Sequence, residues 1–317
     1  MTTTDSTTTP RSRPQPNDQG EGPASTFGQL PTSEDVRSIG EIIRDTRNLS
    51  AEQVGQILAY QKAQGVRFGE AAIALGFATP DDVLHALAQQ FNYAYAGGEG
   101  GDKANPELVV LNQPFSQQAE AFRAIRAQIL LRTQPGAVEG APKVKRALAV
   151  VSPNSGDGKT FFCANLAVAL AQVGGKTLVV DADLRGPRMH DVFGVEAGTG
   201  LTGLLTGRRG DGVVKSVKGV PNLFVLPVGI SPPNPLELLQ GPAFGLLLHE
   251  LLKKFDHVVV DTPAGQYGSD GIVAAARCGV ALVVARKDAN RILALQDLVQ
   301  NLSVTSVQVA GVVMNEF

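Results

Sequence analysis

The sequence predicts an α/β fold in which helices cover both faces of a mostly parallel sheet. Three observations support this prediction. From residue 144 onward, strand-like apolar runs alternate with helix-like segments. A Gly-Lys-Thr loop at residues 158–160 joins the first run to the first helix-like segment, and two later runs end in aspartates. Ahead of this α/β part we expect a small all-α domain and a disordered N-terminal tail.

Two segments without periodicity separate the expected domains. Residues 1–30 are rich in Thr, Ser, Pro, Gln and Gly, which predicts a disordered tail. Residues 97–114 begin with a Gly-rich run and end in Asn-Gln-Pro, which predicts a linker. The α/β domain then spans residues 115–317 and opens with an amphipathic helix over residues 115–133.

Residues 35–96 contain an internal repeat, in which residues 38–61 align with residues 67–90. Ser50 and Thr79 occupy matching positions, and each places a hydroxyl N-cap before a helical turn that carries acidic residues. This pattern predicts a small domain made of two helix pairs. Docking of another protein is the simplest interpretation of such a domain.

The elements of the α/β domain follow from its apolar runs and their periodicity. We expect strands near residues 146–151, 177–182, 222–227, 256–261, 280–285 and 307–313. We expect helices near residues 159–173, 200–206, 236–253, 269–276 and 290–303.

The most informative stretch is the loop at residues 152–160, Ser-Pro-Asn-Ser-Gly-Asp-Gly-Lys-Thr. In a strand–loop–helix setting, loop N–H groups and the helix N-terminus face an anion. Lys159 reaches the outer phosphates of a nucleotide and the Thr160 hydroxyl ligates Mg²⁺. Pro153 departs from the full motif, which has glycine at that position. The predicted nucleotide-binding residues are Ser155, Gly156, Asp157, Gly158, Lys159, Thr160 and Phe161.

Aspartates end two of the expected strands. Asp181 and Asp183 are two residues apart, and such residues face the same way along an extended chain, so both can enter one site. Asp261 ends a later strand, at the edge where open α/β sheets bind ligands. Each aspartate alone is explained as well by a loop cap. Together, behind a Gly-Lys-Thr loop, they favour a magnesium–nucleotide site.

Composition excludes several other classes of function. The chain is 43% apolar and 18% charged with a net charge of −2, so nothing in its charge predicts a nucleic-acid partner. Its two cysteines stand in apolar segments and indicate a reducing compartment. No apolar run approaches the roughly 20 residues of a membrane span, and we see no signal peptide. The scattered histidines predict no metal cluster.

Residues 113–317 resemble bacterial tyrosine kinases (BY-kinases), which are P-loop proteins that accompany chain-length determinants of capsule and exopolysaccharide. The resemblance rests on the Gly-Lys-Thr loop and on two further Walker motifs, at residues 179–185 and 258–263. It also rests on the family's Glu-x-x-Arg-x-x-Arg signature, whose charges would otherwise indicate a solvated helix face. That signature implies an oligomer interface formed by Glu120, Arg123 and Arg126.

The resemblance implies an ATP-dependent protein-tyrosine kinase that regulates exopolysaccharide or capsule synthesis and export, with ATP and Mg²⁺ as cofactors. It implies a membrane chain-length determinant as activator, protein tyrosines as substrates and a homo-oligomeric ring. The expected location is cytoplasmic, at the inner face of the plasma membrane through the partner.

The implied site residues have separate roles. Lys159, Asp181, Asp183 and Arg185 are catalytic, with Asp181 as the first candidate to accept the tyrosine proton, although its role and that of Asp183 are interchangeable on sequence. The metal ligands are Thr160, Asp183 and Asp261, and Asn315 contacts the adenine edge.

One departure from the family concerns the substrate tyrosines. Many BY-kinases end in a tyrosine cluster, whereas the tyrosines of this chain are Tyr60, Tyr93, Tyr95 and Tyr267. Tyr93 and Tyr95, beside the predicted linker, are the reachable alternatives. They are explained as well by packing at a domain edge.

Two alternative functions share most of these features. A positioning ATPase of the partition or division-site type has the same fold, but it carries an extra lysine where this chain has Asn154. A non-catalytic, nucleotide-binding regulator of an exopolysaccharide assembly suits the missing tyrosine cluster.

The repeat also resembles the N-terminal domain of type II secretion and pilus assembly ATPases, some of which bind cyclic di-GMP through paired motifs. The second copy keeps Arg67, Gly69 and Gly76 of that pattern, whereas the first has Ser38 and Arg47 at positions for Arg and Gly. The resemblance implies a cyclic di-GMP site at the three retained residues as one interpretation. Plain protein docking is the other.

Overall fold

The computed structural model describes residues 37–90, 104–134, 144–208 and 212–316. Its sheet has seven strands in the order β3-β4-β2-β5-β1-β6-β7. The strands are β1 (Ala147–Val151), β2 (Thr177–Asp181), β3 (Lys215–Ser216), β4 (Leu223–Leu226), β5 (His257–Asp261), β6 (Gly279–Arg286) and β7 (Gln308–Asn315). Every neighbouring pair is parallel except β3 and β4. The predicted α/β class with a mostly parallel sheet is therefore confirmed.

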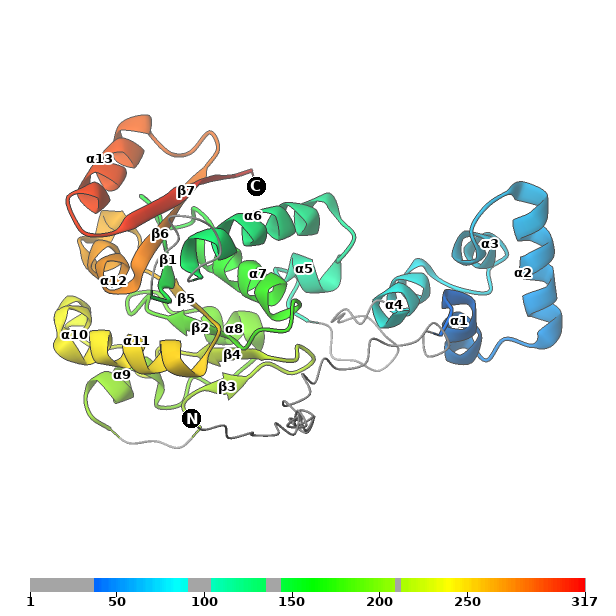
Figure 1. The fold of residues 1–317 in the computed structure, drawn as a ribbon, viewed down its shortest axis with the longest axis horizontal. Helices are drawn as coiled ribbons and strands as arrows, with labels where there is room; N and C mark the ends of the chain where they lie inside the picture. The colour runs from blue at the N-terminus through cyan, green and yellow to red at the C-terminus, as the bar shows by residue number, and fades with distance from the viewer. Residues whose placement is uncertain (1–36, 91–103, 135–143, 209–211, 317) are drawn as a thin grey trace, which may run out of the picture. The chain divides into compact units, whose positions relative to one another are not determined.

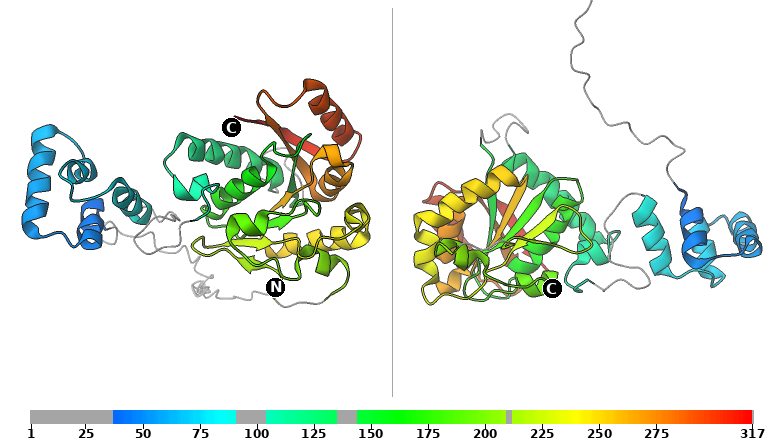
Figure 2. Two further views of the ribbon diagram at one scale, coloured as in Figure 1. Left: turned by 180° about the vertical axis from the view of Figure 1, so that it is seen from behind. Right: turned by 90° about the horizontal axis from the view of Figure 1, so that it is seen from below.

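Helices cover both faces of this sheet (Figures 1 and 2). One face packs against α5 (Val109–Asn112), α6 (Gln117–Thr133), α7 (Lys159–Ala171) and α8 (Met189–Phe193). The other packs against α9 (Gly200–Leu205), α10 (Pro235–Gln240), α11 (Pro242–Lys254), α12 (Asp270–Cys278) and α13 (Ile292–Ser303). Among the described residues, no helix combines the length and the apolar character that crossing a bilayer requires.

The central strands are apolar on both sides because both faces are covered. In β1, Leu148 and Val150 point into the core beneath α7, whereas Ala147, Ala149 and Val151 point into the core beneath α12. This alternation follows from the two-residue period of a strand. Burial of every β1 side chain holds the loop that follows it at the centre of the sheet's carboxyl edge.

Two predicted segments differ from the structure. Residues 104–114 fall within the expected linker, yet Leu108, Val110 and Leu111 are buried in the core beside α7. The helix expected over residues 236–253 is broken between α10 and α11, because Gly241 is extended and Pro242 starts the second helix. Proline fits the first turn of a helix and cannot donate the hydrogen bond that a helix interior needs.

Residues 38–90 form four helices: α1 (Ile39–Arg47), α2 (Ala51–Gln64), α3 (Phe68–Ala74) and α4 (Pro80–Gln90). Their shared core follows the repeat, because Ile42, Ile43 and Ile57 are buried and so are the aligned residues Ala71, Ala72 and Ala86. Contacts join α1 to α4 and α2 to α3, so the first helix of each copy packs on the second helix of the other.

His257, at the start of β5, gives the fold a pH dependence. Burial lowers the pKa of this imidazole. The neighbouring Asp256 charge raises the pKa, but by less, so the pKa stays below its usual value. Below the usual histidine pKa the unfolded chain therefore binds more protons than the folded chain, and stability is lost as pH falls. We expect a lower urea midpoint at pH 5.5 than at pH 7.5, and a smaller difference in His257→Gln. His249→Gln, on the exposed side of α11, is the control; an equal effect of both variants would contradict the prediction.

Candidate nucleotide site

The loop between β1 and α7 has the backbone of a phosphate cradle. Gly156 and Gly158 have φ angles of 82° and 97°, which side chains disfavour, so both positions call for glycine. Gly158 is also the N-cap of α7 and carries no side chain to satisfy the first N–H groups of that helix. These backbone N–H groups remain directed at the loop, where they can donate hydrogen bonds to a bound anion.

Lys159 opens α7 and lies almost entirely inside the protein. Its side chain is 6% exposed, and its Nζ donates a hydrogen bond to Ser152 Oγ at 3.0 Å. Within the ranges that the structure describes, no carboxylate lies close enough to form an ion pair with this ammonium. A buried charge that forms no ion pair is costly. An anion bound at the loop would form an ion pair with the Lys159 ammonium.

Thr160 and Asp261 place two oxygen donors beside this lysine. The Thr160 hydroxyl donates to Asp261 Oδ2 at 2.6 Å. Burial raises the pKa of Asp261 to about 6, although the Thr160 hydrogen bond and the Lys159 charge lower it. Hydroxyl and carboxylate oxygens suit Mg²⁺, which takes few protein ligands and completes its shell with phosphate and water. Accordingly, the described residues contain no cluster of three acidic, histidine or cysteine ligands.

The two aspartates at the end of β2 differ in burial, with Asp181 closing the strand and Asp183 lying just beyond it. The Asp181 carboxylate is fully buried and accepts hydrogen bonds from the N–H groups of Asp183 and Met189. Burial and the nearby Asp261 charge raise the pKa of Asp181 well above its usual value. Asp183 lines the pocket, whereas Asp181 and Asp261 lie behind its wall. The two carboxylates therefore differ in burial, and the expectation that both enter one site stays a prediction.

Asp157, inside the loop, joins it to the ends of two neighbouring strands. Its carboxylate accepts hydrogen bonds from the Asn154 N–H at 2.8 Å and from Asn290 Nδ2 at 2.9 Å. Its carbonyl accepts a third from Asn315 Nδ2 at 3.0 Å. Asn290 follows β6 and Asn315 ends β7. This network holds the loop in place, and Asn315 already uses its amide within it.

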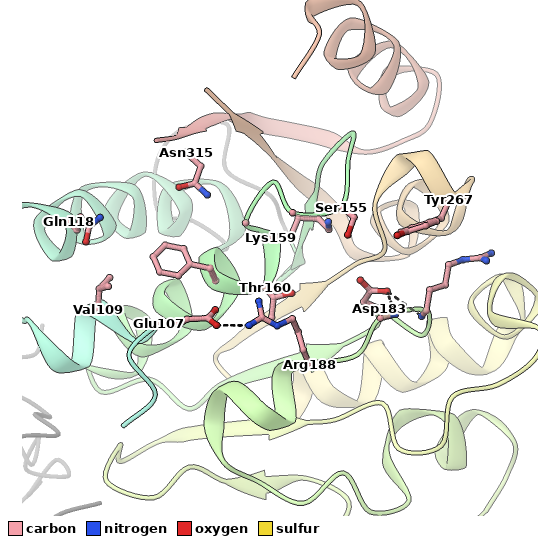
Figure 3. A pocket seen from close by; sticks show the side chains of 15 residues that line it. Glu107, Val109, Gln118, Ser155, Lys159, Thr160, Asp183, Arg188, Tyr267 and Asn315 are labelled. Carbon is pink, nitrogen blue, oxygen red and sulfur yellow. Dashed lines mark hydrogen bonds and ion pairs between the residues drawn. The ribbon is translucent and has the colours of Figure 1, made fainter. Parts of the chain in front are cut away.

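A pocket of about 710 Å³ opens at this loop (Figure 3). Its walls include the predicted Ser155, Gly156, Gly158, Lys159, Thr160, Phe161, Asp183, Arg185 and Asn315. They also include four polar side chains that were not predicted from the sequence, namely Glu107, Gln118, Arg188 and Tyr267. Glu107 and Arg188 form an ion pair at 2.5 Å, although 81 residues separate them in the chain. No local motif signals such a pairing.

Arg185 binds within the chain. Its guanidinium forms hydrogen bonds of 3.2 and 3.3 Å with the buried Asp270 carboxylate at the start of α12. Its side chain remains on the pocket wall, held in one orientation by this pair. The predicted catalytic role of Arg185 stays a prediction.

The residues predicted to form an oligomer interface lie on α6. Arg123 donates to Glu120 at 2.7 Å and to the Pro114 carbonyl, while Arg126 donates to the Ala169 carbonyl on α7 at 2.8 Å. Both arginines therefore have bonding partners in their own subunit. Glu120 stays largely exposed, and the interface remains a prediction.

The residues suggested for cyclic di-GMP have local structural roles. Gly69 lies against Val83 on α4, where a Cβ atom would approach the valine side chain to 2.8 Å. Gly76 has a φ of 74° in the turn before α4. Arg67 is the N-cap of α3, and its N–H donates to Glu70. The ligand stays a prediction, as does the resemblance to secretion ATPases; Tyr93 and Tyr95 lie outside the described residues.

A comparison with protein families decides what kind of domain carries this site. The model of the CobQ/CobB/MinD/ParA nucleotide binding domain matches residues 148–317. The chain belongs to this family. The CobQ/CobB/MinD/ParA match starts in β1 and so includes the whole loop from Ser155 to Thr160 as well as Asp181, Asp183 and Asp261.

Several relatives of this chain are named as tyrosine-protein kinases. It is 38% identical to the tyrosine-protein kinase ptk of Acinetobacter johnsonii over 159 residues, half of this chain and 22% of that protein. It is 35% identical to the putative tyrosine-protein kinase CapB of Staphylococcus aureus, covering 49% of this chain and 65% of CapB. The kinase domain of the Escherichia coli tyrosine kinase ETK superimposes with a TM-score of 0.62 at 28% identity, covering 69% and 83% of the two chains.

These comparisons confirm the predicted resemblance to bacterial tyrosine kinases. The first two curated relatives are much longer proteins, and the matched part spans 22% and 28% of their lengths.

The Asp157 network yields a prediction about nucleotide affinity. Asp157→Ala removes the acceptor for the Asn154 N–H and for Asn290, so the loop loses two hydrogen bonds that hold its shape. We expect the Kd for Mg·ADP to rise about tenfold or more, since a hydrogen bond to a charged group contributes about 1.5–3 kcal/mol. Calorimetric titration measures this. Asp297→Ala, exposed on α13, is the control, and equal Kd values for the two variants would rule out this role for Asp157.

Proposed function

We propose that this protein is a protein-tyrosine kinase that transfers the γ-phosphoryl group of Mg·ATP to tyrosine. The observation that carries the proposal is Lys159, a buried ammonium that forms no ion pair with the described residues, at the mouth of a phosphate cradle. The relatives named as tyrosine kinases support the choice of tyrosine as acceptor.

The pocket residues then divide into three groups by the part of the reaction they serve. Lys159 and the loop N–H groups hold the outer phosphates and balance their charge. Thr160 and Asp261 hold Mg²⁺, which supplies charge neutralisation at the transferring phosphoryl group. Phosphoryl transfer needs chiefly positioning and charge stabilisation, so few residues suffice.

Asp183 is our candidate to orient the acceptor hydroxyl and take its proton. It is the aspartate after β2 that lines the pocket, whereas both Asp181 oxygens accept backbone hydrogen bonds in the interior. One Asp183 oxygen accepts from the N–H groups of Arg185 and Gly186, which fixes its orientation. Asp181 then acts through the turn that it holds, as a positioning residue.

The biological setting is also part of the proposal. A membrane chain-length determinant would activate the kinase, recruit it to the inner face of the plasma membrane and link it to exopolysaccharide or capsule export. The Glu120–Arg126 face of α6 would join subunits in a homo-oligomer. Co-purification of the chain with such a membrane protein is the corresponding test.

The test of the kinase activity uses the full chain, a tyrosine-containing acceptor peptide and ATP, with and without Mg²⁺. We expect phosphotyrosine on the peptide only when Mg²⁺ is present, because the metal site offers few protein ligands and completes itself with phosphate oxygens. Mass spectrometry of the peptide and release of inorganic phosphate are measured together. ATP hydrolysis without phosphotyrosine, also with the membrane partner added, would instead support a positioning ATPase. Binding without either product would support a non-catalytic regulator.

A further inference from the structure

Tyr267 lies at the phosphate end of the pocket, where the proposed function does not use it. It belongs to η1 (Gly265–Tyr267), the short 3-10 helix that follows β5. Figure 3 shows its hydroxyl pointing toward Ser155, on the side of the pocket where Asp183 also appears. Both of these residues line the same pocket, as does Lys159. The phenol therefore faces the space in which the outermost phosphate of a nucleotide would be held.

The turn that carries Tyr267 is attached to the phosphate loop itself. The Gly265 N–H donates to the Ser152 carbonyl at 2.9 Å, and the Gln266 N–H donates to the Pro153 carbonyl at 2.8 Å. In return, the Ser155 N–H donates to Gln266 Oε1 at 3.2 Å. These bonds fix the backbone of Tyr267 relative to the cradle of its own subunit. An acceptor carried on this turn needs no second chain to reach the site.

The Tyr267 side chain is not a packing residue. It is 48% exposed, and its hydroxyl has no hydrogen-bond partner in the part of the chain that the structure describes. Its backbone N–H does bond, to the Ala264 carbonyl, so the main chain is fixed while the phenol is available. A buried structural tyrosine normally hydrogen-bonds its hydroxyl group. The Tyr267 side chain is therefore exposed at the pocket wall, with no hydrogen bond of its hydroxyl to the described residues.

We propose that Tyr267 is an intramolecular phosphorylation site of this chain, an inference that rests on the proposed kinase function. The Tyr267 oxygen forms a bond to the γ-phosphorus of Mg·ATP. The bond between that phosphorus and the bridging oxygen breaks, and ADP leaves with its electron pair. The phenolic proton passes to the Asp183 carboxylate. The product is phosphotyrosine beside the loop that bound the nucleotide.

The first experiment maps self-phosphorylation on the full chain by mass spectrometry after incubation with Mg·ATP. We expect phosphate on Tyr267, at a rate constant that does not change with protein concentration. In a mixture with tagged Lys159→Met chains, only the untagged chains should be labelled at Tyr267. Labelling of the tagged chains would overturn the intramolecular assignment.

Two matched variants test the site directly. Total self-phosphorylation should be lost in Tyr267→Phe and kept in Tyr60→Phe, since Tyr60 lies on α2, away from the pocket residues in sequence. Undiminished labelling of Tyr267→Phe would refute the assignment. Phosphorylation of an added peptide while Tyr267 stays unmodified would refute the Tyr267 site and leave the proposed kinase function standing. Absence of phosphotyrosine on both would defeat the proposed function as well.

A chemical probe reports the position of Tyr267 without any turnover. Nitration by tetranitromethane, measured relative to Tyr60, should fall when Mg²⁺ and a non-hydrolysable ATP analogue bind. Mg·ADP should protect less, because it lacks the outermost phosphate. Equal nitration with and without the analogue would overturn the placement.

Discussion

Replacing Lys159 with methionine is expected to lower phosphoryl transfer by about 10³-fold, the magnitude found when a single preorganised charge or donor is removed from an active site. Lys159 is the buried cation of the cradle, and its position at the start of α7 directs it at the outer phosphates. Methionine keeps the length of the side chain without its charge. Phosphotyrosine formation on an acceptor peptide is the measurement.

The same variant has a second expected result that separates function from folding. Lys159 donates one hydrogen bond, to Ser152, and the described residues offer it no carboxylate within ion-pair distance. Removing such a charge relieves a desolvation cost, so the free energy of unfolding without nucleotide should stay equal or rise. Lys253→Met on the surface of α11 is the control and should change neither quantity. A clear loss of stability in Lys159→Met would mean that the lysine serves the fold.

Gly200→Ala is expected to destabilise the α/β domain by about 3 kcal/mol or more. Gly200 starts α9 with a φ of 58°, and a Cβ atom there would lie 2.2 Å from the Gly229 nitrogen and 2.3 Å from the Val228 carbonyl carbon. These are backbone atoms, which no rotamer change can move. The two segments are also bonded to each other, because the Thr202 N–H donates to the Val228 carbonyl at 3.0 Å. Urea unfolding measures the loss.

Gly207, just after α9, is a matched control for the backbone conformation. Its φ is 76°, but no atom lies within 4 Å of the position that a Cβ would occupy. Gly207→Ala should therefore cost only the left-handed strain of about 1–2 kcal/mol. The difference between the two variants isolates the close approach of the chains. Equal losses of stability would show that φ alone explains both glycines.

The order and type of the longer elements were predictable because each depends on local pattern, whereas the short elements β3, α5 and α8 were not predicted. Val and Leu runs such as β2 and β5, and the Gly-Lys-Thr loop before α7, carry their signal within a few residues. The break at Gly241 was missed because the apolar period continues across it. The burial of Leu108 was missed because it depends on α7, which comes some fifty residues later in the chain.

In the candidate site, too, some features were predictable from local pattern and others depend on distant segments. The loop and its aspartates were predictable as residue types that follow strands. The burial of Asp181 was not predictable, since its carboxylate accepts a hydrogen bond from the N–H of Met189, eight residues later in the chain. The partners Asn290 and Gln266 belong to no motif, and they reach the loop from the turn after β6 and from η1.

The sequence by itself determined that this chain has a parallel α/β sheet and a phosphate cradle that ends in Lys159 and Thr160. Those features depend on periodicity, glycine conformation and short spacing, which are local. Only the tertiary structure decided that Asp183 lines the pocket, that Asp181 is buried and that Tyr267 faces the phosphate end. Each of these results from contacts between distant segments, because side-chain burial and direction depend on what packs against the strand ends.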